Sequence, residues 1–234
     1  MVHFSSNFLR QFFERSIKIA LIICCVASLP QVTNAQQFNL KISKIDTYFG
    51  AEKLPSYQTV FHFEEGFVQK AWWRYIRKIA YIKNKQSHYE NKILAKRSQA
   101  EEDIFCLSLV QFEGGYSTLS LALDKKQSGG ANAKNYNDYL KALLLDFKIK
   151  FYTSYLQELI ANQEKEELRL GSKVDKLERT KEKLENSKNK KNASPKKIEK
   201  DMAQIDGEVE KYRVALFARQ KELDRLKREL KKIR

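Results

Sequence analysis

The chain has 234 residues and carries 44 Lys and Arg against 29 Asp and Glu, which gives a formal net charge of +15 at pH 7. Only 8 Gly and 3 Pro interrupt it and 42% of its residues are hydrophobic, so collagen-like and Pro/Gly-rich disordered chains are excluded and a folded core is expected. With only 3 Cys, the chain is also too poor in cysteine for a disulfide scaffold.

Residues 1–35 have the order of a secretory signal peptide. Arg10, Arg15 and Lys18 precede an apolar run over Ile19–Leu29, and a small-x-small pattern ends at Ala35. We therefore expect cleavage after Ala35 and an exported protein that is periplasmic or associated with the cell envelope. The run is shorter than the roughly 20 residues of a membrane span, so no transmembrane segment is expected after cleavage. An uncleaved N-terminal anchor is the alternative.

Cleavage would leave a single cysteine. Cys24 and Cys25 lie in the leader, and only Cys106 lies beyond it. No internal disulfide is then possible. We interpret Cys106 as a small buried residue of a strand rather than as a reactive thiol.

Residues 36–131 are expected to form a small α+β domain with a mainly antiparallel sheet of four or five strands and one early helix. Strands are predicted, in chain order, over Phe38–Ile45, Tyr57–Phe63, Tyr89–Ala95, Asp103–Phe112 and Tyr116–Leu123. A helix is predicted over Glu65–Ala80, between the second and third of these strands. Its apolar residues at helical spacing are Val68, Trp72, Tyr75, Ile76 and Ile79. Gly114 and Gly115 predict a tight hairpin between the last two strands.

Residues 132–234 predict a long helix and a returning arm that form an antiparallel coiled-coil hairpin. Heptad stripes run from Ile149 to Leu184 and from Ile198 to Ile233, with apolar side chains at most of their a and d positions. Between the stripes, Ser194 followed by Pro195 is typical of a helix start, so the tip is expected near 186–197.

Setting the turn at Ala193 gives a register for this hairpin. The polar seam residues Glu167 and Arg219 then lie opposite each other and form a pair, and Ile160 lies opposite Leu226. An apolar stripe at the start of the long helix is expected to cover the sheet, so that the C-terminal arm docks near the base of the small domain. This stripe is Leu140, Leu144, Phe147 and Phe151. The alternative is an open helix that pairs with a second molecule, giving a coiled-coil dimer instead of a monomer.

Two clusters are candidate binding sites for a partner or ligand. The first is the group of five lysines near the tip, which no acid interrupts: Lys188, Lys190, Lys191, Lys196 and Lys197. Such a concentration of charge would attract an anionic envelope surface or an acidic protein patch. The second is Trp73, which falls off the buried helix stripe and has Lys70 and Arg77 on its side of the helix. Solvated coiled-coil faces and ordinary packing of Trp73 are the competing interpretations. Nucleic acid would suit the charge but not an exported protein.

A weak metal hypothesis rests on two H-x-E patterns. His62 with Glu64 and His88 with Glu90 would share strand faces, and the four side chains could converge on a metal if those strands were neighbours. Exposed polar strand faces explain the same residues. No catalytic motif is recognised, so we expect a protein without enzymatic activity, without a cofactor and without catalytic residues.

The chain resembles uncharacterised secreted bacterial proteins that have a small α+β domain followed by a long Lys/Glu-rich helical hairpin. The residues that carry the resemblance are the Ala-Trp-x-x-Tyr-x-x-Lys pattern over Ala71–Lys78, the Gly114-Gly115 hairpin and the helical C-terminal half. The resemblance implies this architecture and an envelope address. We therefore expect an envelope interaction or scaffold protein. The alternatives are a module that binds an anionic lipid headgroup or glycan, and an enzyme with an unrecognised site in the small domain.

Overall fold

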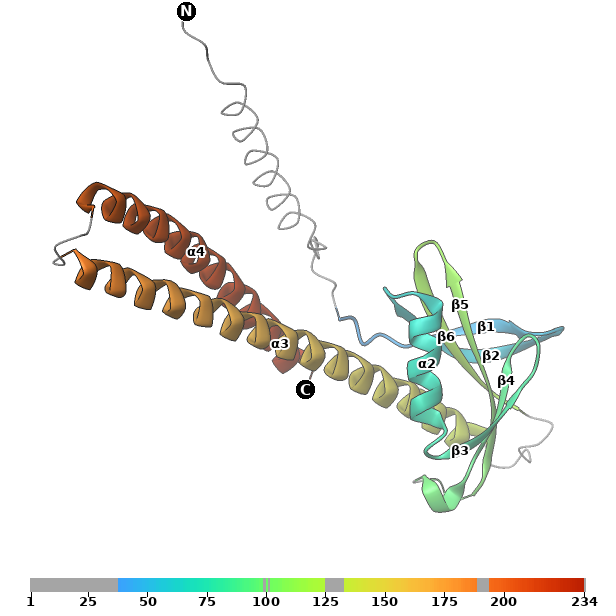
Figure 1. Cartoon of the computed structure of the whole chain (residues 1–234). Coiled ribbons are helices and arrows are strands. Elements are labelled where there is room, and N and C mark those ends of the chain that lie inside the picture. The colour runs from blue at the N-terminus through green and yellow to red at the C-terminus, as the bar shows by residue number, and fades with distance from the viewer. Residues whose placement is uncertain (1–37, 99, 101, 125–132, 189–193, 234) are drawn as a thin grey trace, which may run out of the picture. The chain divides into compact units, whose positions relative to one another are not determined.

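The computed structural model describes residues 38–98, 100, 102–124, 133–188 and 194–233, and Phe38–Arg234 forms one compact unit (Figure 1). The predicted signal peptide, with Cys24 and Cys25, lies outside the described residues. The elements are, in chain order, β1 Ser43–Phe49, β2 Glu52–Phe61, α2 Glu65–Ile76, β3 Ala80–Asn84, β4 Tyr89–Ile93, the 3-10 helix η1 Ala95–Arg97, β5 Ile104–Glu113, β6 Tyr116–Leu123, α3 Ala133–Ser187 and α4 Pro195–Ile233. The fold is α+β with a helical hairpin, as predicted.

The sheet has six antiparallel strands in the order β1-β2-β6-β5-β4-β3. The predicted hairpin between β5 and β6 is confirmed, because Glu113 pairs with Tyr116 across Gly114 and Gly115. Both glycines have positive φ angles, 61° and 86°, which side chains other than glycine rarely adopt. The sequence pattern of this turn therefore predicted its backbone conformation.

Three strands differ clearly from the prediction. Strand β2 runs over Glu52–Phe61, so it begins before the predicted Tyr57 and ends before the predicted Phe63. The first strand was predicted over Phe38–Ile45, but residues 38–42 belong to no strand and β1 begins at Ser43. Its alternation arises because Phe38, Leu40 and Ile42 pack against the core without joining the ladder. Strand β3 was missed, and α2 ends at Ile76 instead of Ala80. The predicted helix was too long because Ile79 follows Ile76 at helical spacing, although a turn joins the two residues.

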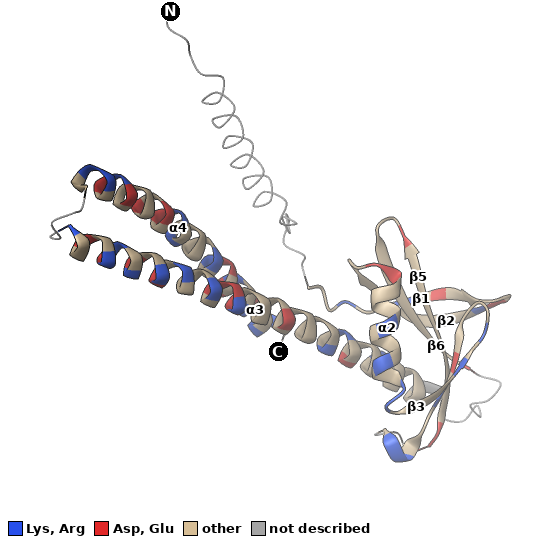
Figure 2. Cartoon of the chain, in the orientation of Figure 1, with Lys and Arg blue, Asp and Glu red and all other residues tan. Residues whose placement is uncertain are grey.

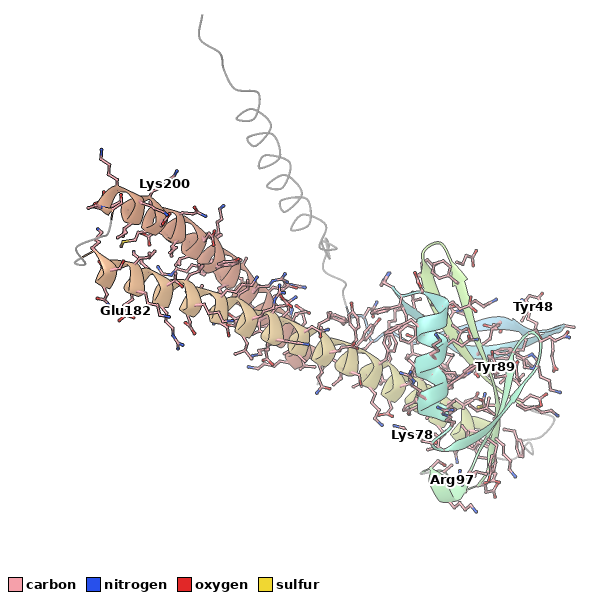
Figure 3. The ribbon with its side chains drawn as sticks, in the orientation of Figure 1. Tyr48, Lys78, Tyr89, Arg97, Glu182 and Lys200 are labelled. Atoms are coloured by element: carbon pink, nitrogen blue, oxygen red, sulfur yellow. The ribbon has the colours of Figure 1, made fainter. Side chains whose placement is uncertain are left out.

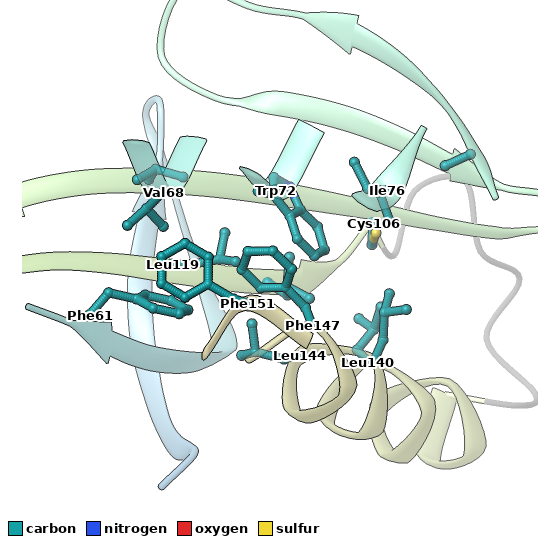
Figure 4. Packing of buried hydrophobic residues seen from close by; sticks show 14 of the residues in the cluster. Phe61, Val68, Trp72, Ile76, Cys106, Leu119, Leu140, Leu144, Phe147 and Phe151 are labelled. Atoms are coloured by element: carbon teal, nitrogen blue, oxygen red, sulfur yellow. The ribbon is translucent and has the colours of Figure 1, made fainter. Parts of the chain in front are cut away.

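Helices α2 and α3 contribute to one core with the same face of the sheet (Figure 4). Trp72 of α2 is fully buried, lies edge-on to Phe147 of α3, and donates its indole N–H to Ser108 Oγ of β5 at 3.2 Å. The predicted sheet-covering stripe of α3 is confirmed, since all of its members are buried in this core. They are Leu140, Leu144, Phe147 and Phe151.

Helix α3 serves both the sheet domain and the hairpin. Its 55 residues span about 82 Å and the 39 residues of α4 about 58 Å at the usual helical rise. The first part of α3 packs on the sheet and its remainder runs beside α4 (Figure 1). Leu226 and Ile233 of α4 are buried in the same core cluster as Leu156 of α3, so the returning arm docks at the base of the sheet domain as predicted.

Candidate functional sites

The hairpin seam is close to the one expected from the heptads. All the a and d residues of both predicted stripes are buried or half-buried, with Val174, Val209 and Leu223 among the buried ones. Lys173 lies over the Tyr212 ring at 5.2 Å, beside the Val174 that the register places opposite Tyr212. This contact agrees with the predicted register to within one residue.

The polar seam residue Arg219 has a different partner from the one expected. It donates to Gln163 Oε1 at 2.9 Å, whereas the register places it opposite Glu167, one helical turn away. The arginine side chain is long enough to span that turn, so the register alone does not determine whether Arg219 contacts Gln163 or Glu167. Glu167 is half-buried and remains part of the seam.

Basic and acidic residues are interspersed along both arms of the hairpin (Figure 2), and exposed ion pairs connect the two helices. The inter-helix pairs are Lys181–Asp206 at 2.6 Å, Arg213–Glu178 at 2.8 Å and Lys227–Glu164 at 3.0 Å. Solvent screens such pairs, and each contributes about 0.5 kcal/mol. Most of the charge on the hairpin is thus the solvated surface of a coiled coil.

The lysine tip is only partly within the described residues. Lys190 and Lys191 lie outside them, whereas Lys188, Lys196 and Lys197 are exposed. Helix α4 begins at Pro195, as the sequence predicts, which places Lys196 and Lys197 in its first turn. Lys188 reaches Glu199 Oε1 at 3.8 Å, so part of the tip charge is balanced across the turn.

Trp73 lies on a concavity that the sequence did not reveal. The concavity, which we call the β3 concavity, has a volume of about 460 Å³. It is lined by Trp73 of α2, by Arg77 directly after this helix, by residues of β3, by Tyr89 of β4 and by Arg97 of η1. Trp73 lies edge-on to the Tyr89 ring at 5.2 Å, and its buried indole N–H has no hydrogen-bond partner within the described part of the chain. Trp73 and Arg77 therefore come together as predicted.

Lys70 is exposed and does not line this concavity, so it is separate from the other two predicted residues. The structure adds Arg97 and Tyr81, with the Arg97 guanidinium 5.6 Å from the centre of the Tyr81 ring. Tyr89 and Arg97 can be followed in Figure 3. The sequence signal that was missed is the short alternation Tyr81-Ile82-Lys83. It indicates strand β3, and Arg97 lines the same concavity as this strand.

The metal hypothesis fails on topology. It required neighbouring strands for the two H-x-E patterns, but β2 and β4 are separated by β6 and β5. His62 and His88 also fall just outside β2 and β4. His88 instead contacts Ser87 and the Phe49 ring in the turn before β4. Across the described ranges, no group of three or more His, Cys, Asp or Glu could hold a metal ion.

Cys106 is a buried free thiol on β5, as expected for a packing residue. Burial raises its pKa to about 12, because the uncharged thiol is favoured away from water. The thiol is therefore almost never ionised near neutral pH, which makes it a poor nucleophile.

Lys148 is a buried cation that was not expected from the sequence. Its side chain is only 1% exposed, and its ammonium donates to Thr59 Oγ1 at 2.6 Å. The Thr59 hydroxyl in turn donates to the carbonyl of Lys41 at 3.0 Å. The ammonium also lies 5.4 Å and 5.8 Å from the ring centres of Phe61 and Tyr152.

Burial lowers the pKa of Lys148 to about 8, because the charged form loses its hydration and no carboxylate among the described residues pairs with it. The only sequence signal was a lysine inside a helical segment that is apolar on two sides.

The comparisons with known proteins give no relative. The chain matches no protein-family model, no curated protein and no solved structure. Over the stretches that the structure describes, no helix is both long enough and apolar enough to cross a membrane. The resemblance to secreted bacterial proteins therefore stays an expectation.

Proposed function

We propose that this chain is an exported interaction or scaffold protein of the cell envelope, without enzymatic activity, that presents a coiled-coil hairpin with a basic tip. The observation that carries the proposal is the single helix α3, which begins in the sheet core and continues to the tip. A partner bound at the tip would be held at a fixed distance from whatever the sheet domain contacts, because no joint interrupts the helix.

The charge of the tip supports a partner of opposite sign. Lys196 and Lys197 are exposed in the first turn of α4, and neither forms an ion pair with another described residue. Cations at this end of a helix are not favoured by the helix dipole. Their presence there is better explained by recognition of an acidic protein or anionic envelope surface than by helix stability.

Cross-linking pull-down from the native envelope tests the proposal. A variant with glutamate at all five tip lysines is compared with the wild type and with a control in which five other hairpin lysines are changed in the same way. The control lysines are Lys165, Lys176, Lys211, Lys221 and Lys231. Capture of a partner by the wild type and the control, with loss in the tip variant, is the expected result. Equal capture by all three would refute a role for the tip.

Export is tested separately on the same cells. Fractionation and N-terminal sequencing should find an envelope form that begins at Gln36. A protein retained inside the cell with an intact N-terminus would refute the envelope assignment, and one found at the membrane with residues 1–35 attached would favour the anchor.

A second candidate function is binding of an anionic lipid headgroup or glycan, and the β3 concavity favours it. Two arginines and three aromatic side chains line this hollow, a composition that suits stacking on a sugar and pairing with its charge. Sedimentation with anionic and neutral vesicles, at low and high salt, tests the lipid form of this function. Salt-sensitive binding to anionic vesicles alone would support it.

A further inference from the structure

Strand β3 is an edge strand whose outer side is open to pairing. Among the strands that the structure describes, it neighbours only β4. The bonds from Leu94 N–H to Ile79 C=O and from Lys85 N–H to His88 C=O, both 2.9 Å, fix which residues of β3 bond to β4. In an antiparallel pair the bonded residues alternate, so the N–H and C=O of Ile82 and Asn84 point to the free edge.

The β3 concavity lies along this free edge, since Ile82 and Asn84 line it. Arg77 at the end of α2 lies on the core side of the sheet with Trp73, whereas Arg97 lies beside Tyr81, whose side chain points to the other side. A strand added to β3 would therefore meet an arginine on each of its two faces. Neither arginine forms an ion pair with another described residue.

We propose that β3 is a site for β-strand addition and that it takes an extended acidic peptide segment of a partner protein. Backbone groups of the edge would supply the hydrogen bonds, while Trp73 and Tyr89 would contact alternate side chains of the peptide. Arg77 and Arg97 would select carboxylates on its two faces. This site is distinct from the hairpin tip, and the proposal does not depend on the function proposed for the tip.

Charge argues against a second copy of this chain as the occupant. Pairing of β3 with itself would bring Lys83, Arg77 and Arg97 of both copies into one small area, and cations on an edge strand are a known protection against such pairing. The same cations favour a partner strand that carries acids.

The experiment measures binding of a fluorescein-labelled hexapeptide, Val-Glu-Glu-Val-Val-Glu, by fluorescence polarisation, with hydrogen exchange on the complex. In an extended strand this sequence carries glutamate on both faces. We expect saturable binding and new protection of the amides of Ile82 and Asn84. The amides of Tyr81 and Lys83 already bond to β4 and should change little. Only every second amide of a paired peptide faces β3. N-methylation of the amides that face β3 should therefore abolish binding, whereas N-methylation of the other set should spare it; we call this dependence the N-methylation phase.

Charge reversal tests the arginines. The double variant R77E/R97E should weaken binding of the acidic peptide by about tenfold or more, and it should gain binding of a Val/Lys peptide. R74E is the matched control, because Arg74 is exposed on the same helix but does not line the β3 concavity. Its affinity for the acidic peptide should stay within about twofold of the wild type.

Three results would overturn the proposal. One is no saturable binding up to about 1 mM peptide. Another is binding without protection at Ile82 or without dependence on the N-methylation phase, which would leave only electrostatic attraction. The third is binding of a sulfated oligosaccharide, lost in R77E/R97E, by a protein that does not bind the peptide. That outcome would assign the concavity to a glycan.

Discussion

Replacement of Lys148 by methionine should stabilise the protein, and the gain should disappear at high pH. Methionine keeps the length of the side chain and removes the buried charge. Lowering a lysine pKa from 10.5 to about 8 corresponds to about 3 kcal/mol of lost stability when both folded and unfolded chains are protonated. Loss of the hydrogen bond to Thr59 offsets about 1 kcal/mol of the gain. The net gain at pH 7 should therefore be about 2 kcal/mol.

The pH dependence has a definite sign. Below pH 8 lysine is charged in both states, so the full cost of burying the charge opposes folding. Between pH 8 and 10.5 the folded protein releases its proton before the unfolded chain does, and the wild type is stabilised as pH rises. From pH 7 to pH 10 this recovers about 2.5 kcal/mol, so K148M should lose its advantage over the wild type.

Urea denaturation followed by far-UV circular dichroism at pH 7, 8, 9 and 10 measures the difference. Cys106 and Tyr152, whose pKa values burial raises to about 12, titrate in both proteins and cancel to first order. K150M is the control, because Lys150 is exposed on the same helix, and its effect should be under about 1 kcal/mol and independent of pH. A K148M gain that stayed constant from pH 7 to pH 10 would refute the reasoning.

Three further predictions concern the fold. Cysteines at Val174 and Tyr212 should form an intramolecular disulfide, seen as a mobility shift on non-reducing gels; failure of this pair with success of cysteines at Val174 and Arg219 would refute the register. Leu144→Ala should lower the free energy of unfolding by about 3 kcal/mol, because Leu144 is fully buried between α3 and the sheet, and a loss under about 1 kcal/mol in urea denaturation would contradict that packing. Gly115→Ala should cost about 1 kcal/mol in the same assay although no atom lies within 4 Å of the added methyl, because its φ is 86°; an unchanged midpoint would mean that the turn adopts another conformation.

Periodic patterns predicted most of the fold. The bounds of β6 were predicted to the residue, and the heptads gave a seam whose members are all buried or half-buried. These signals are strong because each repeats over many residues or is confined by a turn. They are weak where a segment is short. Strand β3 has five residues and was missed, and its first residue, Ala80, was assigned to the end of the preceding helix.

The candidate sites were less predictable because they depend on contacts between distant segments. Sequence reasoning brought Trp73 and Arg77 together through the helical period, but Arg97 joins them only through the β3–β4 hairpin. The same holds for Lys148, whose partner Thr59 lies on a strand 89 residues away. The metal hypothesis failed for the converse reason, since strand order cannot be read from the strands themselves.

The burial of Ile233 in the same core cluster as Leu156 has a consequence for the rate of folding. Bringing these two residues, 77 positions apart, into one cluster closes a long loop, which in a flexible chain would carry a large entropic cost. This loop is itself a helical hairpin, and pairing that starts at the tip brings the two helices together one heptad at a time. Each step closes only a short additional loop, so that the sheet core acquires its last side chains by zippering rather than by a diffusive search. The turn between the arms thus sets the nucleation step for a contact made at the opposite end of the hairpin.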